Sequence, residues 1–199
     1  MTIEAVFLDL GNTLRMLLPD QAHMEKARVE LARLAGTDMD PLAFLELLDL
    51  RYKDYRKWAF AELTEASEED LWTRWLTPDL PAERIAPVAG ELTYLYRQSK
   101  GRRVVVDGGR EVLEELRRRG YVLGIISNLI GKREIPEWLK QEDYQQYFKS
   151  VLLSSVYGRR KQGIKMKRHF LHAASITFEH PRTGEPLKVE SPLPAALED

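Results

Sequence analysis

A short apolar segment near the N-terminus ends in a carboxylate, and this feature places the strongest constraint on the fold. Residues 3–8 are largely apolar, Asp9 follows directly, and the turn formers Gly11 and Asn12 come next. An acid that ends a buried strand lies at the carboxyl edge of a sheet, where open α/β sheets bind ligands. Asp9 can act there as a covalent nucleophile or as a metal ligand. On these residues alone, the alternative is an Asp that merely begins a turn.

Two later segments have the same character as this first strand. Residues 121–126 and 148–155 are short and rich in aliphatic side chains, and the first of them ends at Ser127. A helical pattern precedes each of them, one opening near Asp107 and one at residues 135–147. Strands that alternate with helices in this way form a parallel sheet with crossover helices.

Residues 20–100 have a different period, with apolar side chains at helical spacing. Gly36 suits the position after a helix C-terminus, Asp40 an N-cap followed by proline, and Ser67 the start of a capping box. These signals predict an all-helical block of about four helices. Because the block follows the first strand, the predicted fold class is α/β, a Rossmann-like parallel sheet with an inserted all-helical cap.

The predicted domains follow from these boundaries. A discontinuous core comprises residues 1–18 and 101–175, the helical cap residues 19–100, and a divergent tail residues 176–199. The later strands of a doubly wound sheet are missing, so the C-terminal part of the sheet is predicted to be incomplete. One edge of the first strand is then uncovered unless the tail occupies it, which lowers stability.

The C-terminal segment does not continue the alternation of strands and helices. Residues 164–174 can form a helix, whereas 176–178 and 187–189 flank a turn with two prolines and a glycine and predict a β-hairpin. His169 and His172 lie three residues apart. With no third ligand in view, we expect two ordinary side chains there and no metal site.

Composition excludes several classes of site and partner. The 199-residue chain has 30 Lys and Arg against 31 Asp and Glu, a net charge of −1, so no basic excess favours nucleic acid. Cysteine is absent, which excludes disulfides, thiolate metal sites and cysteine nucleophiles. No segment approaches the ~20 apolar residues of a membrane span. We expect a cytoplasmic protein that binds neither nucleic acid nor membrane, in an oligomeric state that the sequence leaves open.

Polar side chains follow each of the three predicted strands. Asp9 follows the first, Ser127 ends the second, and Lys161 lies in the basic segment after the third. The carboxyl ends of parallel strands meet at one edge of a sheet, so these side chains are expected to lie together. Such a site suits phosphoryl transfer, because the carboxylate attacks, the hydroxyl holds phosphoryl oxygens and the ammonium offsets their charge.

Three motifs resemble those of the haloacid dehalogenase (HAD) superfamily, in the type with a helical cap after the first strand. Residues 9–14 resemble its first motif, residues 120–128 its second, and residues 154–161 the approach to its third. The resemblance covers residues 1 to about 162. It implies a hydrolase, chiefly a phosphatase that acts on a small phosphorylated metabolite through an aspartyl-phosphate.

Carried over to this sequence, the resemblance assigns roles to five residues. Asp9 would be the nucleophile, Ser127 would bind the transferring phosphoryl group, and Lys161 would neutralise its charge. Asn12 and Asn128 would be auxiliary substrate-binding residues. The cap would select the substrate.

The sequence departs from the HAD pattern at two places. Gly11 replaces the second Asp of the first motif, a general acid and base of a kind that contributes about 10²–10⁴-fold. The resemblance also implies Mg²⁺, held by Asp9 and the backbone carbonyl of Gly11, but the acidic motif that completes this site does not follow Lys161. Three alternatives stay open: a catalytically incomplete binding protein, a truncated or frameshifted product without activity, and dehalogenation through an aspartyl ester, which needs no metal.

Most of five aromatic side chains of the helical block are expected to pack in its core, with the lining of a substrate pocket as the alternative. They are Trp58, Trp72, Trp75, Tyr94 and Tyr96. Basic residues surround Lys161 and suit a phosphate group. Nucleic acid is disfavoured at this basic segment, because no aromatic platform accompanies it.

Overall fold

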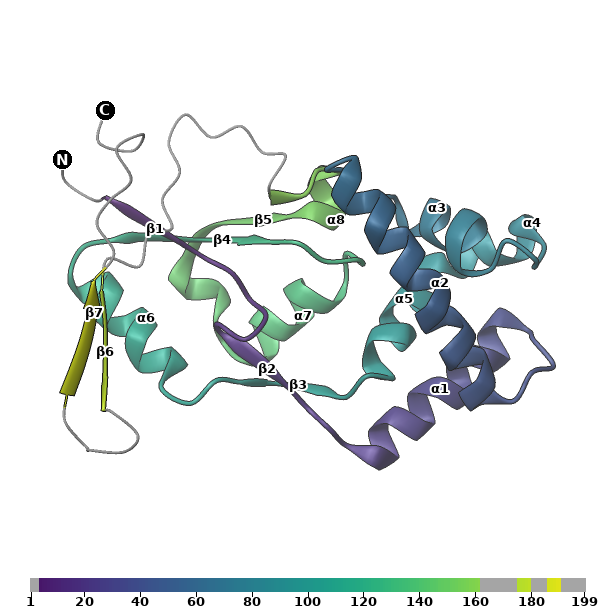
Figure 1. Ribbon diagram of the computed structural model, residues 1–199, viewed down its shortest axis with the longest axis horizontal. Helices are drawn as coiled ribbons and strands as arrows, with labels where there is room; N and C mark the ends of the chain where they lie inside the picture. Colours follow the sequence, from purple (N-terminus) through teal and green to yellow (C-terminus); the bar gives the residue numbers. More distant parts are fainter. Residues whose placement is uncertain (1–3, 162–174, 180–185, 191–199) are drawn as a thin grey trace. The chain divides into compact units, whose positions relative to one another are not determined.

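The computed structural model describes residues 4–161, 175–179 and 186–190. It divides into two compact units, Met1–Ile164 and Lys165–Asp199. The first unit contains a small parallel sheet with its helices and a group of helices at the other end (Figure 1). The expected cap, residues 19–100, lies inside this first unit, whereas the expected end of the core at residue 175 lies beyond Ile164. Both boundaries stay predictions.

The sheet of the first unit has three strands in the order β1-β4-β5, and both pairings are parallel. The strands are β1 (Ala5–Leu8), β4 (Val122–Ser127) and β5 (Phe148–Leu153). Helix α6 (Gly109–Arg118) leads into β4, and α7 (Glu134–Gln141) connects β4 to β5. The predicted α/β architecture with a parallel sheet is confirmed.

The helical insertion, residues 21–98, contains helices and turns without a strand, as expected for the cap. Its segments are α1 (Gln21–Ala35), α2 (Pro41–Ala61), α3 (Glu68–Asp70), a π-helix (Leu71–Leu76), α4 (Ala82–Ile85), a 3-10 turn (Ala86–Val88) and α5 (Ala89–Gln98). The local signals act as predicted. Asp40 caps α2, Ser67 accepts a hydrogen bond from the Asp70 amide, and Gly36 ends α1 in a left-handed conformation.

Two separate hydrophobic clusters stabilise this unit. One is formed almost wholly by the helical insertion, and Trp72 and Tyr96 are buried in it. Trp58 and Trp75 pack against the same cluster, as expected for cap aromatics. The other cluster lies around the sheet and includes Trp138.

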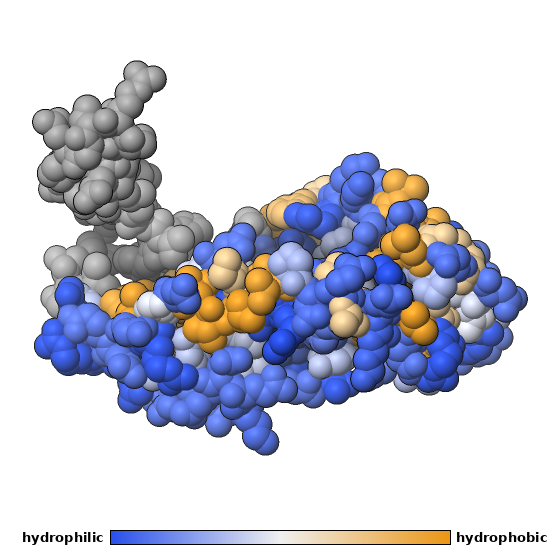
Figure 2. All heavy atoms as spheres, turned by 90° about the horizontal axis from the view of Figure 1, so that it is seen from below, coloured by the Kyte–Doolittle hydropathy of each residue, from blue (hydrophilic) through white to orange (hydrophobic). Residues whose placement is uncertain are grey.

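A two-stranded ribbon connects the sheet to the insertion, and the sequence did not predict it. β2 (Arg15–Leu18) pairs antiparallel with β3 (Arg102–Val105), so the chain enters and leaves the insertion through neighbouring strands. Three successive side chains of β2 are about half exposed, namely Met16, Leu17 and Leu18 at 47, 46 and 48%. Figure 2 shows apolar side chains in several areas of a mainly hydrophilic face.

Two predicted boundaries differ from the structure. The strand expected at 148–155 ends at Leu153, because Ser154–Tyr157 form the short helix α8. The helix expected at 135–147 ends at Gln141 and is followed by a separate 3-10 turn at Gln145–Tyr147. Asp143 has φ +55, a left-handed conformation that an α-helix does not tolerate, which accounts for the interruption.

The second unit contains the predicted hairpin. β6 (Ser175–Glu179) and β7 (Pro186–Glu190) pair antiparallel, with Ile176 opposite Val189. The helix expected at 164–174, with its two histidines, lies outside the described residues. Within the described strands, β1 pairs only with β4. No helix in the described part of the chain is both long and apolar enough to cross a membrane.

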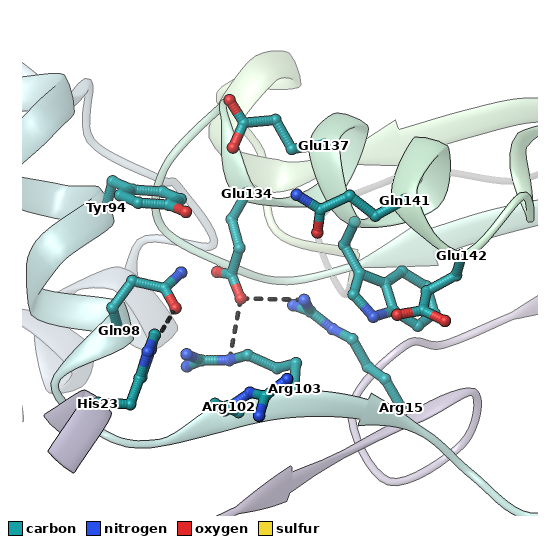
Figure 3. A pocket seen from close by; sticks show the side chains of 11 residues that line it. Arg15, His23, Tyr94, Gln98, Arg102, Arg103, Glu134, Glu137, Gln141 and Glu142 are labelled. Carbon is teal, nitrogen blue, oxygen red and sulfur yellow. Dashed lines mark hydrogen bonds and ion pairs between the residues drawn. The ribbon is translucent and has the colours of Figure 1, made fainter. Parts of the chain in front are cut away.

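A buried carboxylate joins the insertion, the ribbon and the sheet region. Glu134 of α7 is 5% exposed, and its Oε1 lies 2.9 Å from Arg15 Nη1 and 2.9 Å from Arg103 Nε (Figure 3). Its other oxygen accepts a hydrogen bond from Arg97 of α5. Burial by itself raises the pKa of Glu134, but the charges of the three guanidinium groups outweigh burial and lower it.

Glu134→Gln removes the charge that three guanidinium groups share. We expect the free energy of unfolding, measured by urea denaturation, to fall by about 3–5 kcal/mol, because an uncompensated charge then stays in the interior. Glu137→Gln is the control on the same helix, since Glu137 pairs with Arg133 at a partly exposed site. We expect Glu137→Gln to lower the free energy of unfolding by less than about 1 kcal/mol. Equal losses in both variants would contradict the role given to Glu134.

The stabilisation from Glu134 depends on pH with a definite sign. Because folding lowers its pKa below the ordinary value of about 4.3, the ionised form stabilises the fold at neutral pH. We expect the stability difference between the natural chain and Glu134→Gln to be complete above pH ~5 and to shrink as the pH falls further. Urea denaturation at a series of pH values measures it. A difference that stays constant down to pH ~3 would refute the assigned shift.

Candidate active site

The carboxylate of Asp9 lies at the centre of a cluster of polar side chains. Asp9 Oδ1 accepts hydrogen bonds from the Leu10 amide at 2.8 Å and from Ser127 Oγ at 2.7 Å. Asp9 Oδ2 accepts one from Lys161 Nζ at 2.5 Å. The structure therefore brings together the three side chains that the sequence placed at three strand ends.

Strand order explains this convergence. β1 and β5 both pair with β4, and all three strands run parallel, so their carboxyl ends lie at one edge. Asp9 follows β1 directly, and Ser127 is the last residue of β4. Lys161 follows β5 after the short helix α8 and a left-handed turn at Gly158, where φ is +76. The cluster of Asp9, Ser127 and Lys161 thus depends on long-range pairing, although each member occupies a locally recognisable position.

The two asparagines occupy different positions. Asn128 Oδ1 accepts a hydrogen bond from the backbone amide of Lys161 at 2.6 Å, so it connects the loops after β4 and β5. Asn12 is exposed in a left-handed turn, with φ +58, and its amide donates to the carbonyl of Arg15 at 2.8 Å. Contacts of either residue with a substrate stay predictions.

The electrostatics of the cluster keep Asp9 ionised. Burial raises the pKa of the carboxyl, but hydrogen bonds from Lys161, Ser127 and the Leu10 amide, together with the charge of Lys161, lower it overall. Asp9 is therefore a carboxylate at neutral pH, the form that a nucleophile requires.

Gly11 is exposed, and a Cβ added to it would meet no atom within 4 Å. The position therefore has room for the acidic side chain that the HAD pattern has there. The described residues contain no group of three or more acidic or histidine side chains able to hold a metal ion. Both oxygens of Asp9 already accept hydrogen bonds. One such carboxylate and one carbonyl do not complete a Mg²⁺ site, so the donor set found in this part of the chain does not fit the ion.

The sequence did not predict a buried hydrogen-bond network that lies beside the cluster. Glu65 Oε2 accepts hydrogen bonds from Ser154 Oγ and Arg160 Nη1, each at 2.8 Å, and its other oxygen accepts one from Tyr55. Glu65 lies in a loop of the insertion, where no periodicity indicates which charged side chains are buried. The sequence feature that could have indicated a buried acidic partner was Arg160, a basic residue directly before Lys161.

A pocket elsewhere in this unit is separate from the Asp9 cluster. Arg15, Arg103, Tyr94, Trp138 and Glu134 are among its lining residues, and Asp9, Ser127 and Lys161 are not. Figure 3 shows Glu134 pointing between the two arginines in this pocket. Tyr94, expected in the cap core, instead faces this pocket and is only partly buried.

Comparison with known proteins yields short sequence matches and distant structural ones. No protein-family model matches the chain. Ribosomal large subunit pseudouridine synthase C of Yersinia pestis is 49% identical over 37 residues, and that of Salmonella typhimurium is 51% identical over 35 residues. These matches cover 19 and 18% of this chain, which spans only 12 and 11% of the two synthases.

Solved structures with distant similarity to this chain include proteins described as hydrolases. A protein from Bacillus subtilis that is designated a HAD-hydrolase and was solved with bound magnesium is 17% identical, with a TM-score of 0.45. The match covers 81% of this chain and 68% of that one. A dehalogenase is 18% identical with a TM-score of 0.43, over 81 and 67%. A protein from Clostridium difficile designated a phosphatase is 20% identical with a TM-score of 0.41, over 80 and 65%. The fold class stated above rests on this chain's own strand order and helical insertion.

Proposed function

We propose that this chain is a HAD-like hydrolase that removes the phosphoryl group of a small phosphorylated metabolite. The observation that carries the proposal is the carboxylate of Asp9, hydrogen-bonded to Ser127 and Lys161 at the carboxyl ends of parallel strands. The resemblance of the three motifs to those of the HAD superfamily supports the same reaction class. The substrate would enter beside the helical insertion, which would select it.

The proposed reaction has two steps at one phosphorus atom. An oxygen of Asp9 forms a bond to phosphorus while the bond from phosphorus to the leaving oxygen breaks, which gives an aspartyl-phosphate. Water then attacks the same phosphorus, releases inorganic phosphate and restores the carboxylate. Ser127 and Lys161 turn their hydrogen bonds from the carboxylate to the phosphoryl oxygens, where they stabilise developing negative charge.

Gly11 limits the substrates on which this chain can act quickly. A glycine supplies no proton to the leaving oxygen and no base to the attacking water. Esters whose leaving group is stable as an anion, such as aryl phosphates, therefore suit this site better than alkyl phosphates.

Two other functions remain candidates because of specific observations. A dehalogenase-type reaction through an aspartyl ester requires no metal, and the donors that the described residues place around Asp9 do not fit Mg²⁺. A catalytically incomplete binding protein is compatible with the same donor set and with Gly11. Assays with a 2-haloacid, and binding of inorganic phosphate without turnover, distinguish these two from the phosphatase.

Asp9→Asn tests the nucleophile. We expect hydrolysis of p-nitrophenyl phosphate, followed by release of p-nitrophenol with and without added Mg²⁺, to fall to the background rate, because an amide oxygen is a poor nucleophile. Asp54→Asn is the control, since Asp54 pairs with Lys57 on the exposed surface of α2. Equal rates for Asp9→Asn and the natural chain would remove Asp9 from the mechanism.

Gly11→Asp tests whether the missing acid limits the reaction. The new side chain has space, and Gly11 is not among the residues with positive φ, so the change introduces no backbone strain. We expect kcat for alkyl phosphates to rise by about 10²–10⁴-fold, with a smaller gain for p-nitrophenyl phosphate, whose leaving group needs little protonation. Gly11→Asn has nearly the same size without the acid, and an equal gain in that variant would argue against acid catalysis.

A further inference from the structure

The loop that carries Lys161 is held by a loop of the helical insertion. The amide of Glu65 donates to the carbonyl of Gly158 at 3.1 Å, and the amide of Arg160 donates to the carbonyl of Leu63 at 3.1 Å. An isolated antiparallel bridge pairs Thr64 with Arg159 between these bonds. A segment far away in the sequence therefore fixes the backbone up to the residue before Lys161.

A buried ion pair reinforces this backbone contact. The side chains of Glu65 and Arg160 are 0 and 8% exposed, and Glu65 Oε2 lies 2.8 Å from Arg160 Nη1. The guanidinium carbon of Arg160 also lies 4.3 Å from the centre of the Phe60 ring. Removing both charges from water is costly, so the pair tolerates little displacement of either loop.

The same carboxylate also reaches the loop that follows Ser127. Ser154 Oγ donates to Glu65 Oε2 at 2.8 Å and accepts a hydrogen bond from the amide of Leu129 at 2.9 Å. Leu129 lies two residues after Ser127, so Glu65 supports both loops that bring polar groups to Asp9. Tyr55 stays protonated and donates to Glu65, because burial and the neighbouring carboxylate raise its pKa.

Backbone strain occurs where the insertion holds this loop. Leu63 has φ +52, a left-handed conformation that is unfavourable for a non-glycine residue. Its carbonyl is the acceptor of the Arg160 amide. Such strain persists only where surrounding contacts determine the conformation, and here those contacts are the ones that hold the Lys161 loop.

We propose that Glu65 is a positioning residue of the active site: from the helical insertion, it orients the loop that places Lys161 Nζ on Asp9. Glu65 does not touch the substrate in this proposal. It acts through Arg160 and, for the neighbouring loop, through Ser154. The assignment of Lys161 to catalysis rests on the proposed function, whereas the orienting effect on the loop does not.

Glu65→Gln tests the proposal, with Glu134→Gln as the matched control. Both variants neutralise a buried carboxylate that joins the insertion to the sheet region, but only Glu65 contacts the loop that carries Lys161. Hydrogen exchange of individual amides is followed by NMR, and each rate is corrected for the global stability of its variant. In Glu65→Gln we expect the amides of Arg160 and Lys161 to exchange about tenfold faster after that correction. In Glu134→Gln we expect no such change.

Kinetics give a second readout. We expect kcat for p-nitrophenyl phosphate to fall by about tenfold or more in Glu65→Gln with KM nearly unchanged, because a misplaced ammonium impairs the transition state more than binding. If Glu65→Gln does not fold, Arg160→Lys is tested in its place. This variant keeps the charge but loses the planar guanidinium group. We then expect a smaller increase in amide exchange and a smaller fall in kcat.

The outcomes separate the proposal from the proposed function. Unchanged exchange at Arg160 and Lys161 in Glu65→Gln, or equal acceleration in Glu134→Gln, would overturn the positioning role. Faster exchange confined to Glu65→Gln, in a protein that hydrolyses no phosphate ester, would support the positioning role and refute the phosphatase.

Discussion

Parallel pairing of three short strands is the constraint on which the candidate site depends. Asp9 lies more than a hundred residues before Ser127 and Lys161, yet each of the three follows or ends a strand that pairs in the same direction. An antiparallel arrangement of the same segments would place Ser127 at the opposite edge from Asp9. The hydrogen bonds around Asp9 are therefore a consequence of topology, and they set the ionised state of the carboxylate.

Two buried carboxylates connect the helical insertion to the rest of this unit. Glu134 binds arginines from α5, β2 and β3, and Glu65 binds Arg160 beside the candidate site. Buried ion pairs contribute little net stability but strongly disfavour arrangements that separate their members. They restrict how the insertion and the sheet region can be arranged. Through Glu65, the insertion thus contacts the loop that carries Lys161.

The described part of the site has a nucleophile but lacks a general acid and a full set of Mg²⁺ donors. Asp9 has the environment of a nucleophile, since a hydroxyl and an ammonium both donate to it. The position of Gly11 has space for an acid but supplies none, and the described donor set does not fit Mg²⁺. Binding of an anionic group and attack by Asp9 are therefore better supported than efficient protonation of a leaving group.

The sequence by itself determined the elements whose signals are local. Helix caps at Asp40 and Ser67, the left-handed end at Gly36 and the polar residues after the strands were all predicted, because each depends on a few neighbouring residues. Only the tertiary structure decided the rest. The β2–β3 ribbon is formed by strands about ninety residues apart, and burial of Glu65 and Glu134 depends on partners from distant segments. A charged side chain has the same sequence signature on the surface as in the interior, so its role is set by the groups that the fold brings to it.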